Sequence, residues 1–284
     1  MRLPARCGGP QNFSMNGAVA QVIALALHGN AALLRGHSAD FLEQNSTAQF
    51  CQSIQFMRTE RTWFGLRKRQ IALPTPDDWF ADLRARRARG IGVRWIGGTG
   101  AGVPDRLLAG FVGRGGTWIL QVQLSDHAFE RWLDRWLTDG ASGRMDRRIW
   151  RVAYRRADVG RAALPVVELA AARARLVRAL TEIHAFASRV DAKPFTERFE
   201  KALAALAGQP KGEPYHRDLF PPGQVSAPTA AMIHAAQHAW VFGAMGSWND
   251  LCFSGADGAE YGRVSEGLFQ ALTQFIPAVV GADG

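Results

Sequence analysis

The chain has 284 residues, 47% of them apolar and 21% charged, with 9 Trp and 16 Phe. This composition provides for a buried core and excludes a collagen, a coiled coil and a disordered chain, while the length suits one or two domains. The net charge is +9, and the basic excess lies in the first half, where residues 1–162 hold 24 Lys and Arg against 13 Asp and Glu.

The cysteines and the first apolar segment bear on the compartment. Cys7, Cys51 and Cys252 lie far apart, which predicts neither a disulfide framework nor a thiolate zinc site and favours a reducing cytoplasm. The run from Gly17 to Leu27 predicts a helix. It has the outline of a signal-peptide core, but Gln21 and later polar residues favour a buried first helix. The run is too short and too polar to span a bilayer, so we expect no membrane contact.

Mixed strands and helices are predicted up to about residue 160. Residues 50–57, 62–71, 91–95 and 150–155 are predicted strands, and residues 107–112 and 117–124 a hairpin. Thr75, Pro76 and Asp78 form an N-cap signature that opens a helix ending at Gly90. A second helix is predicted from Ser125 to Gly140, because five apolar residues recur there at helical spacing: Phe129, Trp132, Leu133, Trp136 and Leu137.

The apolar period becomes helical beyond residue 160. Helices are predicted over residues 166–190, 194–207 and 229–246 and around 264–275, with a long loop over 208–227. We therefore predict an α+β fold in which an N-terminal, mostly antiparallel sheet with packed helices, residues 1–160, precedes a C-terminal helical domain, residues 161–284.

Arginines form the most extensive pattern in the sequence. All but four of the 34 basic residues are Arg, and guanidinium groups pair well with phosphates and carboxylates. One continuous basic face is predicted from eight of them: Arg84, Arg86, Arg87, Arg89, Arg94, Arg147, Arg151 and Arg155. The alternative is a solvated surface with internal pairs, such as those of Arg131 and Arg135 with the acids beside them. No aromatic residues interleave with these arginines on the polar side of the strands, which disfavours single-strand recognition.

His234 and His238 form a candidate metal site. Histidines four residues apart project from one helix face and can share an ion, and zinc is the metal that this spacing suggests. Ala235 stands where a metallopeptidase would need its Glu base, and a third ligand would have to come from His184, His216 or Asp250. The alternative is a pair of core histidines bonded to carbonyls or acids.

Other constellations are weaker. Cys51 as a nucleophile would need a nearby His, and a small buried thiol in a strand explains it more simply. No Ser occupies a Gly-x-Ser-x-Gly context. The glycines of residues 97–102 favour a flexible turn over a phosphate-binding loop, and residues 240–253 could line a pocket or form a capped turn.

These features predict a soluble, cytoplasmic, non-catalytic binding protein whose arginine face contacts an acidic protein or a nucleic acid. The alternative function is a metal-dependent hydrolase built on His234 and His238, with the long loop as its lid.

Overall fold

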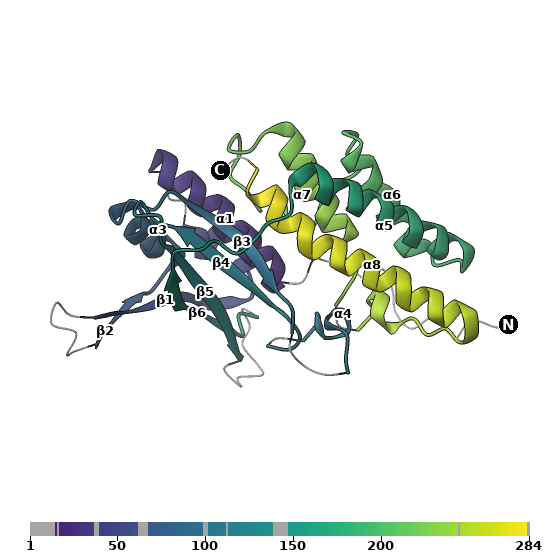
Figure 1. Ribbon diagram of the computed structural model, residues 1–284, viewed down its shortest axis with the longest axis horizontal. Helices are drawn as coiled ribbons and strands as arrows, with labels where there is room; N and C mark the ends of the chain where they lie inside the picture. Colours follow the sequence, from purple (N-terminus) through teal and green to yellow (C-terminus); the bar gives the residue numbers. More distant parts are fainter. Residues whose placement is uncertain are drawn as a thin grey trace.

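The computed structural model describes residues 15, 17–36, 40–61, 68–98, 102–111, 113–138, 147–243 and 245–282. A six-stranded sheet carries helices on one face and continues into a group of long C-terminal helices (Figure 1). The predicted α+β class is therefore confirmed.

The sheet runs in the order β2-β1-β6-β5-β4-β3. Among the strands that the structure describes, only β1 and β6 pair in parallel, and the other four pairs are antiparallel, as the sequence predicts for most of the sheet. The strands are β1 (Cys51–Arg61), β2 (Lys68–Leu73), β3 (Gly90–Ile96), β4 (Thr117–Gln123), β5 (Phe129–Thr138) and β6 (Trp150–Gly160).

Helices α1 (Gly17–Arg35) and α3 (Pro76–Ala85) pack on one face of the sheet, which we call the inner face. By length and composition α1 could cross a membrane, but 67% of its apolar window is buried in the protein, where it acts as a core helix. Thr75 and Asp78 form the predicted capping box at the start of α3. Short helical segments are α2 (Phe41–Gln44), η1 (Ser46–Ala48) and α4 (Asp105–Leu108).

The C-terminal region consists of α5 (Leu169–Arg189), α6 (Lys193–Leu206), α7 (Ala227–Ala239), η2 (Trp248–Asp250) and α8 (Gly255–Val280). Helix α5 buries the predicted stripe, including Leu176, Leu180 and Ile183. One continuous apolar core joins α1, the inner face of the sheet and these helices. The division at residue 160 stays a prediction.

The predicted helix over residues 125–140 is wrong, because residues 129–138 form β5. Trp132 and Trp136 are four residues apart. Residues at this spacing lie on one face of a helix, and they also lie on one face of a strand, where side chains recur every two residues. Leu133 and Leu137 repeat the same ambiguity on the opposite side of the strand. Hydrogen bonds to β4 and β6 satisfy the backbone of β5, and residues 129–138 therefore form a strand and not a helix.

Two further boundaries differ from the sequence prediction. The described part of the first predicted hairpin strand, residues 107–111, does not pair with β4, and residue 112 lies outside the described residues; Asp105–Leu108 form α4 after Pro104, and β4 pairs with β3 and β5. Helix α7 ends at Ala239 because the guanidinium of Arg198 donates to the carbonyls of Gln237 (3.0 Å) and Trp240 (3.2 Å), and Trp240 is extended.

The outer face of the sheet is only partly covered. Residues 161–168 cross β3 and β4 there as a strap: Leu164 N–H donates to Gln121 Oε1 at 2.9 Å, and Arg94 Nε donates to Leu164 O at 3.2 Å. Gln121 is consequently buried, whereas the outer sides of β5 and β6 retain exposed residues such as Arg135 and Arg155.

A network of ion pairs joins α3 to the inner face. Glu130, which is fully buried, binds Arg86 from α3 and Arg156 from β6, the latter at 2.6 Å. Asp82 binds Arg86 at 3.3 Å and Arg58 from β1 at 2.8 Å. Burial opposes the charge of Arg86, but its bonds to Glu130 and Asp82 outweigh this and raise its pKa. The network therefore fixes which side of β5 faces inward.

We expect Glu130→Gln to lower the free energy of unfolding by about 3 kcal/mol or more, because two largely buried guanidinium groups lose their shared counter-charge. Urea denaturation measures the loss. Glu60→Gln is the control, since Glu60 is 45% exposed and Arg58 keeps Asp82; we expect a loss below about 1 kcal/mol there. Equal losses in the two variants would contradict a structural role for the buried pairs.

Candidate functional site

The eight predicted arginines occupy separate parts of the sheet. Arg84, Arg87 and Arg89 are exposed around the end of α3, beside the start of β3. Arg86 lies among them in sequence but points inward to Glu130. This group lies at the end of the sheet where β6 finishes. The start of β3 pairs with the end of β4, and Phe129 at the start of β5 pairs with Gly160 at the end of β6.

Arg94 serves the fold. Its guanidinium donates to the carbonyls of Leu164 and Val93, at 3.2 and 2.8 Å, beneath the strap. Burial lowers its pKa, and no acidic side chain among the described residues pairs with it. Arg94 therefore holds the strap against β3 and is not available to a large partner.

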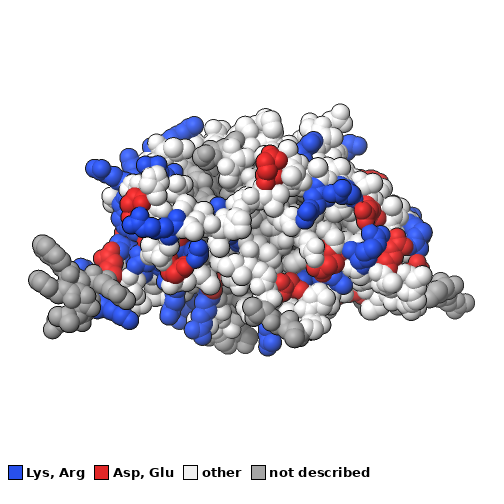
Figure 2. Space-filling model, viewed as in Figure 1, with Lys and Arg blue, Asp and Glu red and all other residues white. Residues whose placement is uncertain are grey.

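Arg151 and Arg155 both project from the outer face of β6, as the predicted strand alternation requires. Arg147 is exposed four residues before Arg151, where β6 begins, and hence at the opposite end of the strand from the α3 group. The structure thus divides the eight residues among separate places and does not gather them on one continuous face. In Figure 2, basic side chains project over the sheet half of the molecule with acids interspersed among some of them.

Arg135 joins Arg151 and Arg155 on the outer face, although its position in the sequence predicted a helix and, as the alternative to a basic face, an internal pair. Across the β5–β6 pair Arg135 faces Ala153, while Leu133 faces Arg155 and Leu137 faces Arg151. Arg135 is therefore the diagonal neighbour of both β6 arginines, at a spacing of roughly 7–8 Å. We call Arg135, Arg151 and Arg155 the strand arginines.

Few acids oppose the strand arginines. The outer-face acid on these strands is Asp158, which binds Arg131 at 2.5 Å. Among the residues that the structure describes, no ion pair is recorded for Arg135 or Arg155, and Arg151 Nε donates to Gln52 Oε1 at 3.2 Å. Three exposed guanidinium groups thus share one patch on the outer face of β5 and β6. Strand periodicity at 131, 133, 135 and 137 is the signal that would have found Arg135.

The histidine pair lies in apolar and basic surroundings. His234 stacks on Phe220, with ring centroids 5.9 Å apart. Burial lowers the pKa of His238 to about 4, and the charges of Arg198 and Lys201 act in the same direction. A site beside two cations suits a neutral imidazole and repels a metal ion.

The three suggested third ligands make other contacts. His184 Nε2 lies 3.3 Å from Glu200, His216 bonds to Ser46 at 2.7 Å, and the Asp250 carboxylate accepts from Gly246 N–H. Within the described part of the chain no three His, Cys, Asp or Glu side chains are grouped as metal ligands. The zinc hypothesis for His234 and His238 therefore lacks geometric support.

A Ser–His–Asp cluster anchors the loop between α6 and α7. Ser46 Oγ donates to Asp218 Oδ1 at 2.5 Å, and Ser46 N–H donates to Asp218 Oδ2 at 2.6 Å. The backbone of His216 exchanges hydrogen bonds with the side chain of Gln237 on α7, at 3.1 and 3.0 Å. In a nucleophilic triad the acid orients the histidine, whereas here both Asp218 oxygens bind Ser46. The cluster is a clasp that fastens the loop to η1.

Cys51 is not an activated nucleophile. Its side chain is 1% exposed, burial raises its pKa to about 11, and its thiol accepts from Gln21 Nε2 at 3.6 Å. Cys7 lies outside the described residues.

Comparisons with protein-family models, with curated proteins and with solved structures found no match to this chain. Its function is therefore inferred from the geometry of its own residues.

We expect the titration of His238 to appear in the pH dependence of stability. Because its pKa is lower in the folded protein than the ordinary 6.5, the unfolded chain binds the proton more readily. This contribution to stability is thus present above pH 6.5 and is lost as pH falls toward about 4. His238→Gln should flatten that part of the profile in urea titrations, with the unmodified protein as the reference. A Zn²⁺-dependent rise in melting temperature that His238→Gln abolishes would favour the metal hypothesis instead.

Proposed function

We propose that this is a non-catalytic binding protein that holds an acidic partner on the outer face of β5 and β6. The observation that carries the proposal is the placement of the strand arginines, exposed at diagonal positions on adjacent strands, with no ion pair recorded for Arg135 or Arg155 in the described residues. Isolated surface cations usually pair with nearby acids or solvent. Three guanidinium groups at diagonal positions instead form a surface whose fields add.

The geometry favours a polymer over a small anion. Arg151 and Arg155 are four residues apart on one strand, or about 13 Å, with Arg135 between them on the neighbouring strand. Phosphates of one nucleic acid strand recur about every 3.4 Å along the helix axis, so a single segment can reach all three. A small anion can occupy one or two of the guanidinium groups.

Contact with a nucleic acid would be to its backbone. On the outer sides of β5 and β6 the neighbours of the arginines are aliphatic, namely Leu133, Leu137 and Ala153. No aromatic ring stands between the strand arginines on which an unpaired base could stack. Bidentate guanidinium–phosphate bonds would position the partner without reading its sequence. We therefore propose duplex nucleic acid as the first partner class to test, and an acidic protein as the second.

The test compares two triple variants with the same change in net charge. Arg135→Gln/Arg151→Gln/Arg155→Gln removes the strand arginines, and Arg84→Gln/Arg87→Gln/Arg89→Gln removes the exposed arginines at the end of α3. Binding to a fluorescent duplex of random sequence is measured against salt concentration. We expect the first variant to lose about tenfold or more in affinity, and its salt slope to fall by two to three, since each phosphate contact contributes about 0.9.

The outcomes separate the alternatives. Equal losses in both variants would mean that net charge alone attracts the duplex, and an unchanged first variant would place the contact elsewhere. If the unmodified protein binds polyglutamate but not the duplex, and the first variant loses that binding, the partner is an acidic protein. Binding of neither polyanion would refute the proposal.

A further inference from the structure

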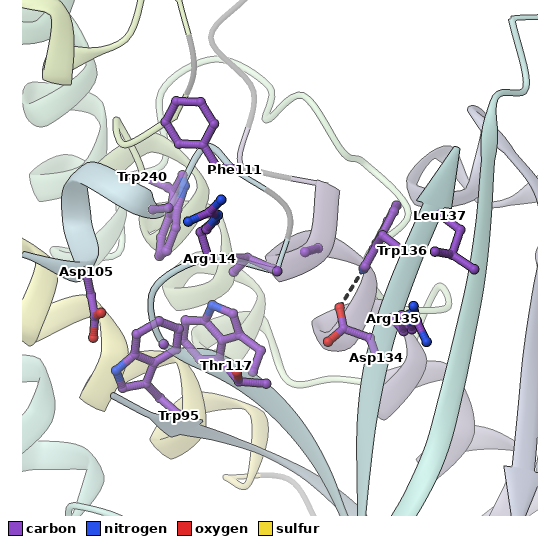
Figure 3. Close-up of a pocket in the computed structure, with 16 residues that line it drawn as sticks. Trp95, Asp105, Phe111, Arg114, Thr117, Asp134, Arg135, Trp136, Leu137 and Trp240 are labelled. Carbon is purple, nitrogen blue, oxygen red and sulfur yellow. Dashed lines mark hydrogen bonds between the residues drawn. The ribbon is translucent and has the colours of Figure 1, made fainter. Parts of the chain in front are cut away.

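A cavity of about 360 Å³ lies between the start of α1, the β3–β4 end of the sheet, the end of β5 and the segment after α7, and Arg135 of β5 also lines it. Figure 3 shows indole rings and carboxylates directed toward this space from several elements. Its volume is at the small end of the range for ligand pockets, which suits a compact molecule.

Four tryptophans form much of the wall: Trp95, Trp118, Trp136 and Trp240. The Trp95 and Trp118 rings are 5.0 Å apart, and Trp118 and Trp240 are 6.2 Å apart, measured between centroids. Trp136 packs edge-on against Trp150 at 5.7 Å. These contacts hold the rings in place without filling the cavity, so the wall presents π faces and edges that are already ordered.

Asp134 is a carboxylate that lines the cavity next to Trp136. It belongs to the inner side of β5, and its Oδ2 accepts a hydrogen bond from Trp136 Nε1 at 2.5 Å. Tyr154 lies opposite it on β6 but donates its hydroxyl to Gln21 Oε1, at 3.0 Å. Among the described residues no cation forms an ion pair with Asp134, although the adjacent Arg135 also lines the cavity from the next position of the strand.

The carboxylate of Asp134 has hydrogen-bond donors but no ion-pair partner among the described residues. Burial raises the pKa of Asp134, against the effects of the Trp136 indole and its own backbone N–H. An unpaired charge in a poorly solvated place is costly, and a perturbed carboxyl group that lines a cavity marks a candidate binding site. A cation in the cavity would offset that cost directly.

We propose that this cavity binds a small organic monocation, a primary or methylated amine on an apolar body, with its ammonium group against Asp134 and its body between the tryptophans. Ammonium groups are attracted both by carboxylates and by indole faces, and the two attractions add here. The carboxylate that would bind the ammonium lies on the other side of β5 from the strand arginines, although Arg135 borders both sites.

Arg114 sets the charge of the ligand. It lines the exposed side of the cavity next to Trp240 and Phe111, across from Asp134 in Figure 3. A second positive charge on the ligand would approach this guanidinium. The cavity therefore favours monoamines over diamines of similar length.

The test uses phenylethylamine as the probe and follows tryptophan fluorescence and isothermal titration with the full chain. Phenylethanol is the neutral isostere, 3-phenylpropionate the anionic one, and 1,5-diaminopentane the dication. We expect the amine to bind at least about tenfold more tightly than each of the others. Asp134→Asn should remove this preference, because the amide can still accept from Trp136 but carries no charge. Asp158→Asn makes the same charge change on the outer face and should leave amine binding unaltered.

A measurement on the unmodified protein covers the case in which Asp134→Asn fails to fold. Amine affinity should fall as pH decreases through the raised pKa of Asp134, while phenylethanol affinity stays level. Equal affinity for amine and alcohol would reduce the cavity to an apolar void, and absence of amine binding would overturn the proposal. Loss of amine preference in Asp158→Asn would place the cation elsewhere.

Discussion

The alternation of side chains along β5 is the constraint on which both proposed sites depend. Glu130, Trp132, Asp134 and Trp136 lie on the inner side, and Arg131, Leu133, Arg135 and Leu137 on the outer side. A slip of one residue would exchange the two sets. The ion pairs of Glu130 with Arg86 and Arg156 oppose that slip, because they can form only when Glu130 faces α3. The same buried carboxylate thus directs Asp134 toward the tryptophans and Arg135 toward solvent.

Arginine has two distinct uses in this protein, which is why net charge alone is a poor guide to its surface. Three arginines, Arg58, Arg86 and Arg156, form ion pairs with acids on the inner face. Arg94 and Arg198 donate to backbone carbonyls, and burial lowers the pKa of Arg198 to about 10. A guanidinium group suits this internal work because it offers five donors in a planar array. Fewer arginines are therefore available to a partner than the sequence suggests, and the register of the strands determines where those arginines lie.

Local signals predicted much of the fold. The capping box at Thr75, the alternation of Val152 and Tyr154 and the stripe of α5 each specify an element within a short window. The sequence did not predict β5, because a spacing of four residues fits the period of a helix as well as that of a strand. The two proposed sites were harder to predict from the sequence than the fold. Arg135 meets Arg151 only through pairing of strands, and the cavity draws on β3, β4, β5 and the segment after α7, whose approach depends on tertiary packing.

The cavity also shows how the two halves of the chain depend on each other. Three of its tryptophans come from the sheet, whereas Trp240 follows α7. Arg198 of α6 holds the carbonyls of Gln237 and Trp240, so the helical region determines where α7 stops and where that indole lies. Phe269 of α8 then contacts both Trp95 and Trp240, at 5.6 and 6.0 Å. A sheet without the C-terminal helices would lose one wall of the cavity and the support of another, so the amine site belongs to the whole fold, whereas the strand arginines belong to the sheet alone.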